Sequence, residues 1–284
     1  MKFQYLGTAA AEGWPAAFCK CEHCRRAEAA GGKNIRTRSQ AIVGDDLLID
    51  LPPDTYLHKL QHGLNLSAVK YLLVTHCHMD HFYPQELTVR GGVYSPVMDS
   101  PDLEIFCSAE TKNLFDRCTR DEMDPRLGAL LHWHILKPFE RVQAGPYTVT
   151  PLPASHMGEG NEPFIYHIQD AEGVNIYYLH DSGRYARSVW EYFDKQEPAD
   201  LISLDTTNGE ESYNDGHGSH MGAPDVIRVV KEMREMGFAD EHTMCVMNHF
   251  SHNGHLLYDE LAALAAPEGI LVSYDGMKLE LKPR

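Results

Sequence analysis

The chain has 284 residues, 43% of them hydrophobic, and a formal net charge of −16. This length and apolar content are enough for a large core, and so acidic a surface repels a phosphate backbone, which argues against binding of extended nucleic acid. No apolar run approaches the roughly 20 residues of a membrane span, and the sequence turns polar too early for a signal peptide, so we expect a cytoplasmic protein.

Short apolar segments alternate with segments of helical spacing along the whole chain. We expect strands at 3–6, 41–43, 47–50, 71–74, 103–107, 132–136, 140–142, 147–152, 164–169, 174–179, 201–204, 243–247, 270–273 and 278–281. We expect helices at 25–30, 54–64, 84–89, 109–118, 184–195, 223–236 and 256–265. Asp45-Asp46, Glu172-Gly173 and Asp275-Gly276 are predicted hairpin turns. Without a linker, the pattern predicts one α/β domain over 1–284, either a two-sheet sandwich with outer helices or a single open sheet.

The strand expected at 71–74 runs directly into the sequence T-H-C-H-M-D-H-F at 75–82. This loop carries four side chains that bind metals: His76, His78, Asp80 and His81. At these spacings the four cannot all reach one ion. They suit two adjacent ions, each with an open position for water.

Three later side chains of the same kind also stand where expected strands end. They are His156, Asp181 and His249. A single histidine is more often an ordinary surface or core residue than a ligand. Ligands at strand ends, however, converge on one edge of a sheet. If these residues did not bind metal, four separate strand ends would each have to carry such a side chain by chance.

The H-x-H-x-D-H run, followed by a lone His, Asp and His, resembles the metallo-β-lactamase superfamily. The resemblance implies an αββα sandwich of the metallo-β-lactamase type with a dinuclear site at its edge. It implies that His76, His78 and His156 hold one ion. It implies that Asp80, His81 and His249 hold the other, and that Asp181 bridges the pair.

A second cluster consists of three of the seven cysteines: Cys19, Cys21 and Cys24. They are too close in sequence for independent disulfides and suit three corners of a tetrahedral zinc site. We expect His252 as the fourth ligand, because it follows His249 by three residues and one loop could serve both sites. His23 and His255 are the alternatives.

The small-residue stretch L-G-T-A-A-A-E-G, the C-x-C-x-x-C run, the intact H-x-H-x-D-H and a late N-H-F-S-H together resemble the cyclic phosphodiesterases of the carbon–phosphorus lyase pathway. That family hydrolyses a cyclic phosphate on a ribose and carries a separate structural zinc. The similarity implies a catalytic histidine before the long late helix. His220 fits, His217 stays open, and the helix N-terminus that follows would suit a phosphate.

We therefore expect a phosphodiesterase for small, cyclic phosphodiesters, with Asp80 and His220 in catalysis. Two Zn²⁺ or Mn²⁺ ions would lower the pKa of a shared water, so that hydroxide attacks phosphorus while His220 protonates the leaving alkoxide. Arg36, Arg38 and Arg184 could contact phosphate, although ion pairing at the surface is the commoner role.

Other functions of the same superfamily remain open at this point. One is a tRNA 3′-processing endonuclease, but such an enzyme needs a basic surface that grips RNA, and the sequence lacks one. The others are a thioester or lactam hydrolase and a non-catalytic member that acts in cofactor biosynthesis or as a binding protein. The sequence leaves open whether the protein is a monomer or a homodimer.

Overall fold

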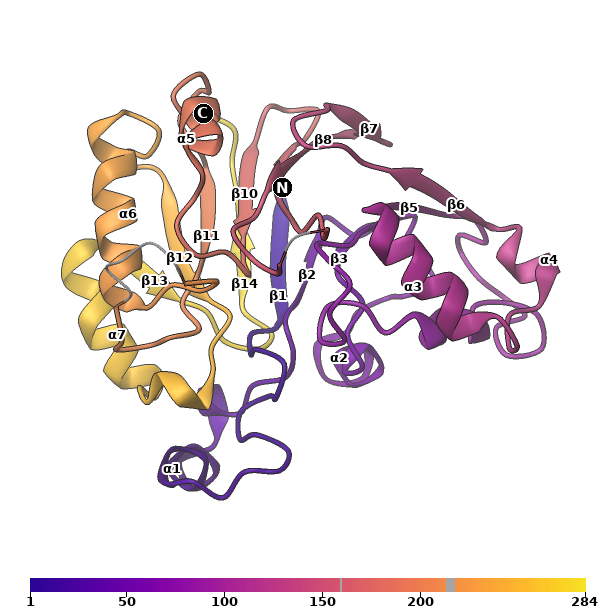
Figure 1. The fold of residues 1–284 in the computed structure, drawn as a ribbon, viewed down its shortest axis with the longest axis horizontal. Coiled ribbons are helices and arrows are strands. Elements are labelled where there is room, and N and C mark those ends of the chain that lie inside the picture. Colours follow the sequence, from indigo (N-terminus) through magenta and orange to yellow (C-terminus); the bar gives the residue numbers. More distant parts are fainter. Residues whose placement is uncertain (159, 213–217) are drawn as a thin grey trace.

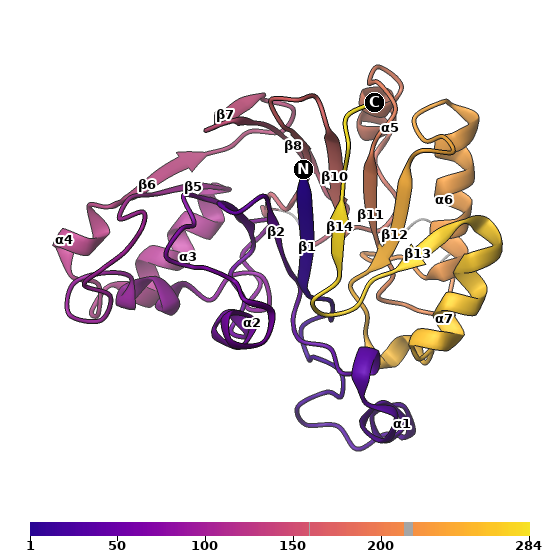
Figure 2. The same ribbon diagram turned by 180° about the vertical axis from the view of Figure 1, so that it is seen from behind.

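The computed structural model describes residues 1–158, 160–212 and 218–284. Two sheets of seven strands each pack face to face, and helices cover their outer faces. Figures 1 and 2 show α2 and α3 beside one sheet and α5, α6 and α7 beside the other. The expected αββα sandwich is therefore confirmed, and a single open sheet is excluded.

The first sheet combines an antiparallel part with a parallel part. Its order is β14-β1-β2-β3-β4-β5-β6. The strands are β1 (Lys2–Gly7), β2 (Gln40–Val43), β3 (Leu47–Ile49), β4 (Tyr71–Leu73), β5 (Leu103–Cys107), β6 (Leu131–Ile135) and β14 (Lys278–Glu280). The antiparallel pairing of β2 with β3 confirms the hairpin expected at Asp45-Asp46.

The second sheet is antiparallel from β7 to β10 and parallel from β10 to β13. Its order is β13-β12-β11-β10-β9-β8-β7. The strands are β7 (Val142–Ala144), β8 (Tyr147–Pro153), β9 (Phe164–Gln169), β10 (Asn175–Leu179), β11 (Leu201–Asp205), β12 (Met244–Asn248) and β13 (Ile270–Val272). Because β9 and β10 pair antiparallel, the second expected hairpin is also confirmed.

Six of the seven expected helices are found as α-helices with shifted ends, and a short helix over 125–128 was not expected. They are α1 (Glu22–Ala30), α2 (Thr55–His62), α3 (Ala109–Thr119), α4 (Pro125–Gly128), α5 (Arg187–Phe193), α6 (Ala223–Glu235) and α7 (Tyr258–Ala265), with 3₁₀ turns η1 (Gly32–Asn34), η2 (Pro84–Val89), η3 (His252–Gly254) and η4 (Ala266–Glu268). The helix expected at 84–89 is thus a 3₁₀ helix. None of the helices in the described ranges is long and apolar enough to cross a membrane.

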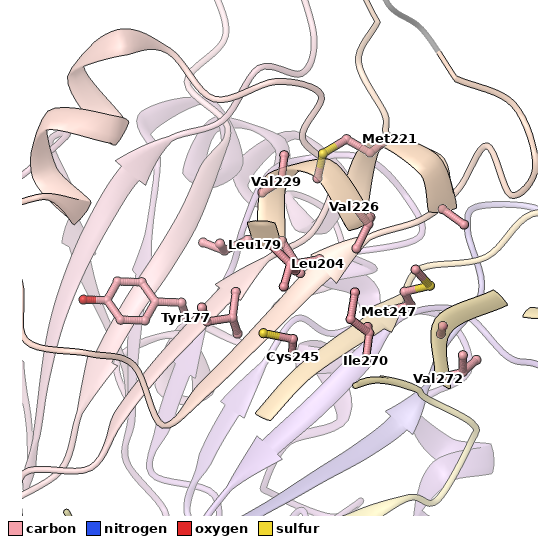
Figure 3. Packing of buried hydrophobic residues seen from close by; sticks show 14 of the residues in the cluster. Tyr177, Leu179, Leu204, Met221, Val226, Val229, Cys245, Met247, Ile270 and Val272 are labelled. Carbon is pink, nitrogen blue, oxygen red and sulfur yellow. The ribbon is translucent and has the colours of Figure 1, made fainter. Parts of the chain in front are cut away.

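Both faces of the second sheet are buried, which explains its continuous apolar strands. In β11, Leu201 packs between the two sheets, while Ile202 and Leu204 face the helices. Figure 3 shows this outer layer, where Leu204 lies near Val226 and Val229 of α6, and Met247 lies near Ile270 and Val272. Each fully buried aliphatic side chain contributes roughly 1.5–3 kcal/mol, so this layer fixes α6 firmly on the sheet.

The hairpin expected at the C-terminus is wrong. Strand β13 pairs with β12 in the second sheet, whereas β14 pairs with β1 in the first. The connecting turn crosses between the sheets, because the Asp275 carboxylate accepts hydrogen bonds from Thr8 and Thr37. Gly276 adopts a positive φ of 85°, as a hairpin glycine also would, so the local pattern could not separate the two outcomes.

Candidate metal centre

The loop after β4 forms a tight turn that turns the motif's side chains inward. The backbone N–H of His81 donates to the carbonyl of His78 at 3.0 Å, and that of Phe82 donates to the same oxygen at 2.8 Å. His76, Asp80 and His81 are buried, while His78 is exposed. The four candidate ligands of this loop therefore face one region from a single turn.

Three histidines form the first ligand group. Nδ1 of His78 lies 2.9 Å from Nε2 of His76 and 3.1 Å from Nε2 of His156, which follows β8. Three imidazole nitrogens this close cannot all be satisfied by hydrogen bonds to one another, since each ring carries at most one proton when neutral. Lone pairs that converge in this way are suited to a cation.

The second group joins two histidines and two carboxylates. Nε2 of His81 lies 2.6 Å from Oδ2 of Asp181, 3.2 Å from Oδ2 of Asp80 and 3.3 Å from Nε2 of His249. All four residues are buried, and their potential ligand atoms lie within 4.8 Å of one another. A mixed imidazole and carboxylate set of this kind accepts zinc or manganese.

Asp181 lies between the two groups. Its Oδ2 is 2.6 Å from Nε2 of His81 in the second group and 3.4 Å from Nε2 of His76 in the first. Its Oδ1 is buried and makes no hydrogen bond with any described residue, although Nδ1 of His249 and Nδ1 of His220 lie 3.3 Å and 3.4 Å from it. A buried carboxylate oxygen without a hydrogen bond is costly unless a cation meets it, so the donor set fits a pair of ions.

A further carboxylate orients His81. Oδ2 of Asp50, which directly follows β3, lies 2.7 Å from Nδ1 of His81. The same carboxylate accepts hydrogen bonds from the backbone and the hydroxyl of Thr75. A proton held on Nδ1 by Asp50 leaves the lone pair of Nε2 directed at the candidate ion, a common arrangement around metal-binding histidines.

Three residues around this centre have backbone torsions that side chains rarely adopt. Asp50, Asp181 and His249 have φ values of 65°, 50° and 62°, and all three come at the ends of strands. Such left-handed torsions cost about 1–3 kcal/mol each and persist only where the surroundings impose them. The chain therefore accepts local strain in order to turn these side chains toward the site.

His220 stands at the rim of the second group. Its Nδ1 lies 3.0 Å from Oδ2 of Asp205, the buried last residue of β11, and 3.4 Å from Oδ1 of Asp181. Burial disfavours the charged imidazole, but these carboxylates outweigh it and raise the pKa of His220 to about 9. The alternative, His217, lies outside the described residues.

The N-terminus of α6 does not offer the expected phosphate site. The N–H of Gly222 donates to Oδ2 of Asp225, and the N–H of Ala223 donates to the carbonyl of Gly209. Pro224 has no N–H to give. The first donors of α6 are therefore already satisfied by the protein.

A pocket of about 380 Å³ opens onto the candidate ligands. Glu12 and Ser251 form part of its wall, together with Asn208 and Asn253. None of the three arginines considered for phosphate binding lines this pocket. Arg38 forms an ion pair with Asp54 at 3.0 Å. Arg36 is buried and donates a hydrogen bond to the Thr8 hydroxyl, and Arg184 is exposed.

The cysteine cluster forms a separate compact site with His252. Nδ1 of His252 lies 3.4 Å from Sγ of Cys21 and 4.0 Å from Sγ of Cys19, and all four ligand atoms, including Cys24, lie within 4.8 Å of one another. Zn–S bonds of about 2.3 Å in a tetrahedron place sulfurs about 3.8 Å apart, so a zinc ion fits. The rivals His23 and His255 instead stack on each other, 4.4 Å between ring centres.

The thiols of the cluster differ in acidity, since burial raises the pKa of Cys24 to about 11. Burial opposes ionisation of Cys21, but hydrogen bonds from the Cys24 backbone and from His252 lower the pKa of its thiol to about 6. A thiolate at neutral pH is the form that binds zinc. Nε2 of His252 faces Oε1 of Glu12 at 3.7 Å, so Glu12 lies between the cysteine cluster and the pocket.

Comparison with known proteins identifies the family. Residues 46–250 match the model of the beta-lactamase superfamily domain, a range that includes the whole H-x-H-x-D-H run and ends just after His249. The chain belongs to the metallo-β-lactamase superfamily. It is a hydrolase of this superfamily with a buried His/Asp metal site. No curated protein matches it significantly.

Solved structures of the superfamily share the fold over nearly the full length. A new diphosphatase from the PhnP family is 18% identical over 99% of this chain and 98% of that chain, with a TM-score of 0.75. Zn²⁺-bound PqqB from Methylobacterium extorquens is 17% identical over 99% and 100%, with a TM-score of 0.72. Human tRNase Z, short form, is 16% identical over 99% and 100%, with a TM-score of 0.67. At such identities the likeness establishes the fold alone.

Within this superfamily fold, each residue expected as a ligand lies in one of the ligand groups described above, whereas the alternatives His23 and His255 lie outside the cysteine cluster. The two residues that sequence analysis missed are Asp50 and Asp205, which orient His81 and His220. Both stand at strand ends, but that position alone does not separate them from the other acidic residues of the chain.

Proposed function

We propose that the chain is a dinuclear metal-dependent phosphodiesterase for small, including cyclic, phosphodiesters. The observation that carries this proposal is the position of His220. Its Nδ1 is 3.0 Å from Asp205 and 3.4 Å from Asp181, so an imidazole with a raised pKa stands beside the carboxylate that joins the two ligand groups. A proton donor in this position suits a poor, alkoxide leaving group.

His76, His78, His156, Asp80, His81, His249 and Asp181 would hold the two ions. When bound, a pair of divalent ions supplies an activated water and neutralises phosphoryl oxygens. The chain's own contribution is to hold the ligands and to place a proton. Hydrolysis forms one bond from water oxygen to phosphorus and breaks the bond to the leaving oxygen, which takes its proton from Nε2 of His220. The attacking water releases one proton, and His220 takes up a proton from solvent before the next turnover.

The proposal also draws on likeness. The PhnP-family structure is named a diphosphatase, so chemistry at phosphorus occurs on this fold. The tRNase Z structure has the same fold, but the net charge of −16 here opposes a polyanionic RNA.

The test is a hydrolysis panel on the metal-loaded protein. It would compare ribose 1,2-cyclic phosphate, 2′,3′-cyclic nucleotides, bis-p-nitrophenyl phosphate, a thioester and a β-lactam. We expect the cyclic and linear phosphodiesters to have the highest kcat/KM. A thioester or lactam at the top of the panel would refute the proposal.

The role of His220 is tested by changing the leaving group. His220→Ala should lower kcat about 10²–10⁴-fold for a dialkyl or ribose-cyclic phosphodiester, which expels an alkoxide. It should lower kcat much less for expulsion of p-nitrophenolate, which needs no proton. Equal losses for both leaving groups would remove His220 from the role of proton donor.

A further inference from the structure

A second pocket adjoins the metal centre. It measures about 540 Å³ and is lined by the segment that follows β8 and by Gly218 and Ser219. His156 lines both this pocket and the pocket over the ligands, and its Nδ1 lies 3.4 Å from the carbonyl of Ser219. The two pockets therefore share a first-group ligand in their walls, and we refer to them together as the cleft, with a metal compartment and a second compartment.

The second compartment presents neutral hydrogen-bonding groups beside apolar surface. Ser155, Asn161 and Ser219 supply hydroxyl and amide groups, and Pro153 and Pro163 supply apolar walls. The Ser155 hydroxyl donates to the carbonyl of Arg184 and the Asn161 amide donates to that of Gly158, so the oxygens of these two side chains are the atoms that can accept from a ligand. Such a lining matches an organic group that has both hydroxyls and an apolar face.

Carboxylates mark both ends of the cleft. Glu12 lines the metal compartment and is held by the Ser251 hydroxyl, while the exposed Glu162 lines the second compartment. Among the described residues that line the cleft, the charged side chains other than histidine are all carboxylates: Glu12, Asp80, Asp181 and Glu162. Asp80 and Asp181 would face the ions, whereas Glu12 and Glu162 would face the rest of the substrate.

We infer that the cleft selects a phosphodiester with a single phosphate whose other group is uncharged and hydroxyl-bearing, such as an unphosphorylated nucleoside or sugar. This inference rests on the proposed function and narrows its substrate class. One phosphate meets the ions, and the hydroxyls of the organic group meet Ser155, Asn161 and Glu162. A second phosphate would face Glu12 or Glu162 at short range and the chain's negative field at long range.

A matched pair of chromogenic esters tests this inference. The first is thymidine 5′-(p-nitrophenyl phosphate). The second is the same ester with a further phosphate on the 3′-oxygen, so that the leaving group is unchanged. On the metal-loaded enzyme we expect kcat/KM to be at least tenfold higher for the first ester, with most of the difference in KM.

Two substitutions locate the cause. Glu162→Gln and Glu12→Gln should each reduce the preference for the unphosphorylated ester at least threefold, because each should improve hydrolysis of the phosphorylated ester. The metal content of Glu12→Gln is checked as well, since Glu12 accepts a hydrogen bond from Ser251. Glu172→Gln, in the exposed β9–β10 turn, is the control and should leave the preference unchanged. At higher ionic strength the wild-type preference should shrink, since screening weakens repulsion.

The outcomes separate the two proposals. Equal hydrolysis of both esters, a preference for the phosphorylated ester, or a preference that neither glutamate variant changes would overturn this inference and leave the phosphodiesterase intact. Hydrolysis of neither ester by protein loaded with both ions would overturn the proposed function, and this inference with it.

Discussion

Oδ2 of Asp205 lies 3.0 Å from Nδ1 of His220, so a fully buried carboxylate fixes the imidazole that we propose as the proton donor. Asp205 is itself held by backbone N–H groups of Asp181, Thr207 and Met221. The carboxylate therefore has a defined position before any substrate arrives. Because the Nδ1–H group of His220 donates to this carboxylate, Nε2 is the nitrogen that can donate a proton to the leaving group of the substrate.

Asp205→Asn should impair proton donation without removing the imidazole. Loss of the negative charge lowers the pKa of His220 from its value of about 9, so the protonated donor is lost at a lower pH. We expect the alkaline limb of the kcat profile for an alkoxide-releasing ester to move toward lower pH, with kcat reduced 10–100-fold at pH 8. A pH–rate series measures this, and an unshifted limb would show that Asp205 only supports the fold.

Asp181→Asn should weaken both ions rather than one. Its carboxylate approaches His76 at 3.4 Å and His81 at 2.6 Å, so it serves both ligand groups. His156→Ala is the matched comparison, since His156 belongs to the first group only. Metal analysis after dialysis should find both active-site ions reduced in Asp181→Asn and one in His156→Ala. Full occupancy of both sites in Asp181→Asn would rule out the bridging role.

Cys21→Ser should release a metal that the active site does not use. The thiolate of Cys21 lies 3.4 Å from His252, and loss of one of four ligands weakens zinc binding strongly. We expect one fewer zinc per chain and a lower melting temperature, while the active-site ions remain. Cys118→Ser, a partly exposed cysteine outside the cluster, should change neither value. Unchanged zinc content in Cys21→Ser would argue against the cysteine site.

A buried histidine far from the metals should make stability fall in mild acid. His167 stacks on Tyr177 and lies 2.8 Å from the hydroxyl of Tyr192, and burial lowers its pKa to about 4. Because the unfolded chain takes up the proton near pH 6.5, this contribution is complete above that pH and is lost as the pH falls toward 4.

Between pH 7 and pH 5 the loss from His167 alone is about 2 kcal/mol of the free energy of unfolding. Urea unfolding of wild type and His167→Gln at both pH values gives the difference. The variant should lose about 2 kcal/mol less stability than wild type over this interval. His242→Gln, at an exposed site, should match wild type, and equal losses in all three proteins would contradict the assignment.

The sequence predicts local features of this fold well and long-range choices poorly. The metal ligands were predictable because each follows an apolar strand, and strand ends meet at one edge. Asp50 and Asp205 obey the same rule, but among 41 acidic residues only their contacts with His81 and His220 single them out. The C-terminal turn at Gly276 carried a hairpin signal, yet its partner strands belong to different sheets.

The fourth ligand of the cysteine cluster illustrates the same limit. His23, His252 and His255 were all possible from their spacing. Only the three-dimensional arrangement, which stacks His23 on His255 and leaves His252 beside Cys21, distinguishes them. Tertiary contacts between segments more than 200 positions apart are not encoded in any local pattern.

A metal titration of metal-depleted protein tests the central claim most directly. With the cysteine cluster already filled, hydrolysis of bis-p-nitrophenyl phosphate should rise from background as Zn²⁺ or Mn²⁺ is added and reach its plateau at two further ions per chain. The same protein with Asp181→Asn should not reach that plateau at equal metal. A plateau at one ion, or full hydrolysis by the metal-depleted protein, would contradict a dinuclear phosphodiesterase.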